Sequence, residues 1–101
     1  MAAKDTQPKK KPTKAEKEVD GVRLDPPTIG LITGNTVTFV AEERPGVVTA
    51  KIVTSRDTWV VNASQNNGDA RVSKILEVPG EITVEFYEDG KLYASGSWAV
   101  G

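Results

Sequence analysis

The sequence predicts an all-β protein, an antiparallel β-sandwich preceded by a lysine-rich arm, and three observations lead to this prediction. Short runs rich in β-branched and aromatic residues recur at roughly 8–12-residue spacing from residue 22 onward. Turn signals such as Pro45-Gly46 and Pro79-Gly80 separate these runs. None of the runs has the apolar period of an amphipathic helix. The length of 101 residues suits one domain with one core.

The predicted strands follow one another in chain order after the arm. The segment 21–32 contains Pro26-Pro27 and predicts an edge strand that is interrupted and then resumed, because proline cannot donate a hydrogen bond to a strand ladder. In the next segment Val37, Phe39 and Ala41 alternate mainly with threonines, which predicts a strand with one buried face. The turn-rich segment SQNNGDA follows a later strand. Further strands are predicted at 47–55, 58–64, 70–78, 81–87 and 91–100, about seven in all.

The turn between the last two strands sets their register. A two-residue turn at Asp89-Gly90 puts the apolar residues of the two strands on opposite faces. A three-residue loop over 88–90 instead pairs Phe86 with Leu92 and gives one consistently apolar face. Because a one-residue slip flips every side chain, burial favours the three-residue loop. We therefore expect a type I turn with Gly90 in the left-handed region as part of a G1 bulge.

The N-terminal arm, residues 1–20, differs in composition from the domain at 21–101. The arm has too few apolar side chains to offset the entropy of ordering, which predicts disorder. One local exception is a capping box with Thr13 as N-cap and Glu16 three residues later, which predicts a nascent helical turn that folds on a partner. The preferred interpretation of this segment is a solvated linker, and folding on a partner is the alternative.

A lysine cluster is the strongest sequence hint of a partner, and it consists of Lys9, Lys10, Lys11 and Lys14. Residues 21–101 carry seven basic and ten acidic side chains, so a basic arm precedes a mildly acidic domain. Lysine charge supports attraction to phosphate backbones. The arm has no arginine to read bases and no aromatic side chain to stack on them. The first interpretation of this charge run is a solvated tail. If the arm binds a partner, docking to an acidic protein surface is preferred over nucleic acid.

The two ends of the domain resemble a bacterial immunoglobulin-like domain of the group 2, invasin/intimin-related type. The likeness covers about residues 21–45 and 79–100, and the matching positions near the start are Gly21, Val22, Leu24, Pro26, Gly34, Val37, Phe39 and Ala41. The middle departs from the family, because AKIVTSRD lacks the tryptophan usual in the third strand. The resemblance implies an immunoglobulin-like sandwich that acts as an adhesive or structural module on bacterial surface proteins or on phage capsid and tail proteins. It implies no catalytic residues.

Composition argues against most catalytic chemistry. The chain has no cysteine and no histidine, which removes thiol nucleophiles, the usual general base and the commonest metal ligand. The acid pairs Glu42-Glu43 and Glu88-Asp89 fall at strand ends or in a turn, where solvated charge is expected. The SGS segment at 95–97 lacks a nucleophile elbow, and the NAS segment at 62–64 is interpreted as a chance glycosylation match. We predict no enzyme activity, no cofactor and no metal site.

Three aromatic residues are candidates for surface recognition, namely Trp59, Tyr87 and Tyr93. For Trp59 and for Trp98 the competing interpretation is a core or half-core position, because each shares a strand face with valine. Both tyrosines are expected on the outer face of the sheet.

The functional prediction combines the resemblance with the arm. We expect a non-enzymatic phage virion protein, a capsid decoration or tail protein, assembled in the host cytoplasm. Residues 1–20 would tether it to a protein scaffold, and the sandwich would bind cell-surface carbohydrate weakly. The alternatives are a domain of a bacterial surface adhesin, displayed on the cell, and a small nucleic-acid-associated protein. No apolar run is long enough to span a membrane.

Overall fold

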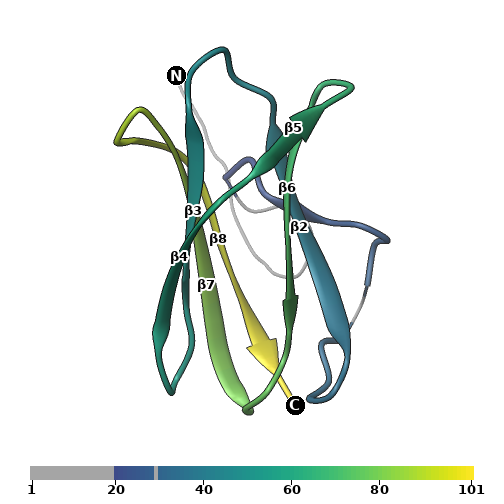
Figure 1. The fold of residues 1–101 in the computed structure, drawn as a ribbon. Coiled ribbons are helices and arrows are strands. Elements are labelled where there is room, and N and C mark those ends of the chain that lie inside the picture. Colours follow the sequence, from purple (N-terminus) through teal and green to yellow (C-terminus); the bar gives the residue numbers. More distant parts are fainter. Residues whose placement is uncertain (1–19, 29) are drawn as a thin grey trace, which may run out of the picture.

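The computed structural model describes residues 20–28 and 30–101, which form two antiparallel four-stranded sheets that face each other (Figure 1). One sheet has the strand order β1-β2-β6-β5 and the other has the order β4-β3-β7-β8. The strands are β1 Arg23–Leu24, β2 Thr36–Glu42, β3 Val48–Val53, β4 Thr58–Asn62, β5 Ser64–Asn66, β6 Asp69–Ile75, β7 Gly80–Glu88 and β8 Lys91–Val100. The all-β sandwich predicted from the sequence is confirmed, with eight strands in place of about seven. Within the described ranges no helix is long and apolar enough to cross a membrane.

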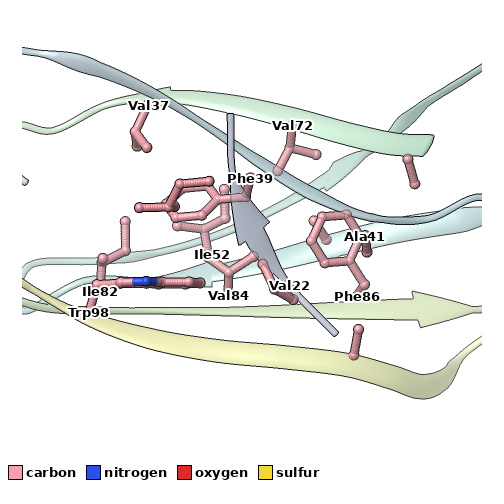
Figure 2. Close-up of a cluster of buried hydrophobic side chains, with 14 of the residues drawn as sticks. Val22, Val37, Phe39, Ala41, Ile52, Val72, Ile82, Val84, Phe86 and Trp98 are labelled. Carbon is pink, nitrogen blue, oxygen red and sulfur yellow. The ribbon is translucent and has the colours of Figure 1, made fainter. Parts of the chain in front are cut away.

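The core lies between the two sheets and follows the strict alternation of strand side chains (Figure 2). Every second residue is buried along β3 and in β7 from Ile82 to Phe86. Phe39 of β2 and Phe86 of β7 are 0% exposed. Burying an aromatic side chain of this kind contributes about 1.5–3 kcal/mol to stability. Val37, Phe39 and Ala41 of β2 are buried as predicted, but Val40 on the opposite face of the strand is buried as well.

The β7–β8 hairpin has Val84 and Phe86 on the predicted buried face, but Leu92, predicted on the same face, pairs with Tyr87 and is exposed. The predicted three-residue loop and the pairing of Phe86 with Leu92 are wrong, because Phe86 pairs with Ala94 and the tip is a two-residue turn. Asp89 and Gly90 have φ values of 50° and 84°, as a type I′ turn requires, so the expected left-handed Gly90 is confirmed. The extra residue is Tyr93, a β-bulge in β8.

Interlayer packing explains why the extra residue lies in β8. The observed register places Trp98 opposite Ile82, and the Trp98 ring centroid lies 5.3 Å from that of Phe39 in the other sheet. The ring also lies over Gly96, where an added Cβ would come within 2.5 Å of Trp98 Cη2. The core position predicted for Trp98 is confirmed, at 7% exposure. The glycine in the SGS segment is therefore required for packing.

The N-terminal segment of the domain contributes to both sheets, as expected for an interrupted edge strand. β1 pairs with β2, whereas Gly21 forms a parallel bridge with Ser95 and Leu31 forms one with Val100, both in β8. Two backbone hydrogen bonds at Gly101, one from Thr33 and one to Leu31, close this end. The β8 border is therefore covered at Ser95 in its middle and at Val100 at its C-terminal end.

One strand was not predicted. The turn-rich segment SQNNGDA contains β5, which pairs with the start of β6 through a tight turn at Asn67-Gly68. The chain passes from β4 in one sheet directly to β5 in the other, with Ala63 between them (Figure 1). The strand was missed because Ser64–Asn66 are polar and none of them is fully buried, so the segment has no apolar alternation.

Candidate protein-binding edge

The two sheets have four border strands, and they differ in how they are protected. β1 has two residues and is followed by Pro26 and Pro27, and β5 has three polar residues. β8 is bordered by the bridges at Gly21 and Leu31. β4 has five residues, no proline and no charged side chain. Among the described residues, β4 pairs on one side only, with β3. Natural proteins usually protect a border strand with charge, proline or short length, and β4 has none of these.

The backbone of β4 presents hydrogen-bonding groups on its outer side that have no partner among residues 20–28 and 30–101. Ala63 N–H donates to the carbonyl of Val48 at 3.0 Å, which fixes the alternation along the strand. In an antiparallel pair such bonded positions recur every second residue. Trp59 and Val61 therefore bond to β3, and the amide and carbonyl groups of Thr58, Val60 and Asn62 point away from the sheet.

The side chains of β4 are unusually apolar for an exposed strand. Val60 is 68% exposed and Trp59 is 41% exposed. Val60 lies on the outer face of its sheet, beside Lys51 of β3. Trp59 pairs with Ile52 and lies on the core side of the strand, at its open border. β4 thus combines free backbone groups with apolar side chains on both faces.

A buried lysine holds Trp59 in place. Lys74 of β6 is 4% exposed, and its Nζ lies 3.6 Å from the ring centroid of Trp59. Within the described part of the chain no carboxylate lies within ion-pair distance of this ammonium group. The ring face attracts the charge, a contact typically worth about 0.5–2 kcal/mol. Trp59 is therefore a fixed side chain at the margin of the strand.

A cluster of polar side chains away from β4 joins the β2–β3 loop to the β7–β8 hairpin. Arg44 Nε donates to Glu88 Oε1 at 3.0 Å, and this hydrogen bond raises the pKa of Arg44. Glu88 Oε2 accepts from the amide of Gly46, and Asp89 Oδ1 accepts from the amide of Val47. These carboxylates hold the β2–β3 loop against the β7–β8 hairpin. The sequence predicted that the Glu88 and Asp89 carboxylates are solvated, but both accept hydrogen bonds from the β2–β3 loop.

A second cluster covers the outer face of the β1-β2-β6-β5 sheet. Arg71 forms ion pairs with Asp25 and Asp69, and Arg23 also contacts Asp69. Val40, whose partners in register are Arg23 and Arg71, is 0% exposed although it lies outside the main core. The two arginines that form these ion pairs therefore flank the buried side chain of Val40 on the outer face of the sheet. The described residues contain no group of three or more metal-ligating side chains.

The predicted site residues lie in three different places. Trp59 lies on the candidate edge, partly exposed. Tyr87 lies on the outer face as expected, and its hydroxyl donates to Glu85 Oε1 at 2.9 Å, which raises the pKa of Tyr87. Tyr93 corrects the prediction, because the bulge turns its ring against Phe86 at 6.3 Å, where it packs on the core. Its hydroxyl donates to the carbonyl of Glu42.

The lysine cluster lies outside the described residues, as does the predicted capping box at Thr13 and Glu16. The candidate site residues Lys9, Lys10, Lys11 and Lys14 therefore stay predictions, and so does the division into an arm at 1–20 and a domain at 21–101. Val60 was missed, because the border position of β4 depends on the strand order of the whole sheet. The available signal was the uncharged segment TWVVN.

Comparisons with known proteins give one structural likeness. No family model and no curated protein matches the chain. A solved structure of the Pseudomonas fluorescens alkylpurine DNA glycosylase AlkC, bound to DNA containing an abasic site analog, is similar with 18% identity and a TM-score of 0.49. The match covers 69% of this chain and 27% of that chain. At this level of similarity we infer no shared function.

The predicted phage virion role is corrected, because no family model and no curated protein matches the chain and the solved structure found is not a capsid or tail protein. The comparison favours neither the adhesin nor the nucleic-acid alternative, and we propose none of the three below.

Proposed function

We propose that the chain is a non-catalytic module of the immunoglobulin-like type that binds an extended protein segment along β4. The single observation that carries this proposal is the unprotected border of β4, where the outward backbone groups of Thr58, Val60 and Asn62 have no partner within the described part of the chain. An added strand gains main-chain hydrogen bonds along such a border. The exposed side chains of Trp59 and Val60 then favour a partner strand with uncharged side chains, because a charged group would lose its hydration against them.

The contact between Lys74 and Trp59 also supports a binding role for β4. Lys74 fixes the Trp59 ring against the border, so little rotamer freedom is lost when a partner packs on it. A hollow of about 250 Å³ lies between the segment 25–36 and Leu76, but the Asp25 carboxylate at its rim is paired with Arg71. The hollow therefore presents no free acid–base pair, and it does not compete with β4 as a site.

The immunoglobulin-like assignment is supported by the N-terminal segment, which pairs with both sheets, and by the passage from β4 to β5 between the sheets. These connections tie the two layers at opposite borders. An experimental structure with the eight strands in another order would contradict the assignment.

Strand addition is tested with a synthetic peptide that copies residues 56–64, RDTWVVNAS. Titrated into ¹⁵N-labelled protein, the peptide is expected to shift the amide resonances of Thr58, Val60 and Asn62 first. A control peptide with proline at the position of Val60 cannot donate the central hydrogen bond and is expected to shift them far less. Equal effects of the two peptides, or no shift at millimolar peptide, would contradict the proposal.

A further inference from the structure

The border strand β4 is complementary to an antiparallel copy of itself. Its outward-facing positions, Thr58, Val60 and Asn62, are spaced evenly about Val60. A two-fold axis at Val60 places Val60 opposite Val60 of a second copy and Thr58 opposite Asn62. Outward-facing groups then meet outward-facing groups, so each such pair exchanges two hydrogen bonds. An isologous interface requires this kind of self-complementarity.

The side chains agree with the same register. Trp59 lies opposite Val61 of the second copy on the core side, and aromatic–β-branched pairs each contribute about 0.2–1 kcal/mol. A shift by two residues in one direction sets Asp57 against Val61. A shift in the other direction sets Trp59 against Ala63, where the chain leaves the sheet. Both shifts keep fewer of the outward-facing pairs, so the register centred on Val60 is preferred.

Charge complementarity favours a neutral partner at this border. β4 has no charged side chain, so an acidic or basic strand would find no opposite charge along it. The charged residues that precede β4 are Arg56 and Asp57, and in the two-fold register they lie opposite the uncharged Ser64 and Ala63. No like charges face each other between the two strands. A second copy of this chain therefore meets the electrostatic requirement.

We propose that two copies of the chain pair through β4 about a two-fold axis at Val60, which joins their β4-β3-β7-β8 sheets into one continuous sheet. Pairing covers Val60 and Trp59, which are 68% and 41% exposed in the single chain. This proposal rests on strand addition at β4, which it deepens by naming the partner. The seam is five residues long, so the dimer forms and dissociates with concentration.

Sedimentation equilibrium of the full chain tests the dimer. The average mass is expected to rise from 10.8 kDa toward twice that value as concentration increases. Val60→Pro removes an amide that points outward and leaves the β3 pairing intact, so this variant is expected to fold and to stay monomeric. Val60→Lys gives a second monomeric variant, and circular dichroism checks that both are folded. Leu92→Lys is the matched control, because Leu92 is 53% exposed on β8 at the other border of the same sheet, and it is expected to dimerise like the parent.

Cross-linking tests the register independently. The chain has no cysteine, so Val60→Cys introduces a unique thiol. Paired residues at a hydrogen-bonded antiparallel position have Cα atoms about 5.5 Å apart, which suits a disulfide. Under mild oxidation Val60→Cys is expected to form covalent dimers several times faster than Leu92→Cys. Equal rates for the two variants would overturn the two-fold register.

The outcomes separate the dimer from strand addition itself. A parent chain that stays monomeric at all concentrations, while the 56–64 peptide still shifts the β4 amides, overturns the dimer and leaves strand addition standing with another partner. A monomeric parent that also ignores the peptide overturns both. A dimer that survives Val60→Pro and Val60→Lys overturns the proposed seam.

Discussion

Gly96 shows how one residue determines the packing of the core. Its Cα lies beneath the Trp98 ring, and an added methyl group would meet Cη2 at 2.5 Å. Gly96→Ala is therefore expected to lower the free energy of unfolding by about 1–3 kcal/mol, because the ring must shift against Phe39. Urea unfolding measures the change. Gly30→Ala is the control, since nothing lies within 4 Å of its added Cβ, and its effect is expected within about 0.5 kcal/mol. Equal losses for the two variants would contradict this account.

The burial of a second residue, Tyr93, predicts how the free energy of unfolding depends on pH. Burial raises the pKa of Tyr93 above its ordinary value of 10.0. A raised pKa in the folded state means that the stability from the neutral hydroxyl is fully present below pH 10 and is lost as the pH rises through the higher folded-state value. Tyr93→Phe loses the hydrogen bond to the Glu42 carbonyl, at a cost of about 0.5–1.5 kcal/mol near neutral pH.

The difference between the parent and Tyr93→Phe is therefore expected to shrink above pH 10, because only the parent carries the ionisable group. Chemical unfolding of both proteins at several pH values measures this difference. A gap between the parent and Tyr93→Phe that stays constant from pH 7 to above pH 10 would contradict the burial argument.

The pairing of β4 on one side only predicts alternating hydrogen-exchange rates for the amides along this strand. In the monomer, Trp59 and Val61 are expected to exchange slowly because their amides bond to β3. Thr58, Val60 and Asn62 are expected to exchange faster, since their amides face outward. Hydrogen exchange followed by NMR at low concentration checks the alternation. Uniform protection along the strand would show that β4 is paired on both sides.

The strands also show how far local sequence determines the fold. Alternation identifies the buried set of β2 and of β7 because a two-residue period belongs to the strand itself. The position of the bulge at Tyr93 depends on Trp98 meeting Phe39 across the sandwich, which no local pattern contains. β5 escapes prediction for a related reason, because its polar residues are defined as a strand only by their pairing with β6.

The order of strands in a sheet is a property of the whole molecule, and it determines which strands are borders that can bind a partner. Nothing in TWVVN alone says that β4 is a border strand. Its neutral composition becomes meaningful once the order β4-β3-β7-β8 is known. The sequence predicted a sandwich and the recognition candidate Trp59, but the accompanying Val60 required the assembled sheet.

The closure of the β8 border yields a prediction at this scale. Thr33 donates to the Gly101 carbonyl from both its amide and its hydroxyl, and the Gly101 amide donates to Leu31. Deleting Gly101 removes these contacts and is expected to lower the free energy of unfolding by about 1–3 kcal/mol. Thermal or urea unfolding measures the loss, and Thr33→Val is expected to give a smaller one. A deletion without effect would show that the border is held by the Leu31 and Gly21 bridges alone.

The bulge in β8 determines which changes of chain length this hairpin tolerates. Tyr93 is the unpaired residue between a ladder that matches Tyr87 with Leu92 and one that matches Phe86 with Ala94. A natural homologue lacking this single residue would join the two ladders and keep every later side chain on its present face. Loss of Ser95 would also remove the bulge and keep Trp98 opposite Ile82, but it would place Tyr93 on the core face opposite Phe86, where the chain now has the small side chain of Ala94. Length variation among descendants of this sequence should therefore be found at position 93 and be absent between 94 and 98.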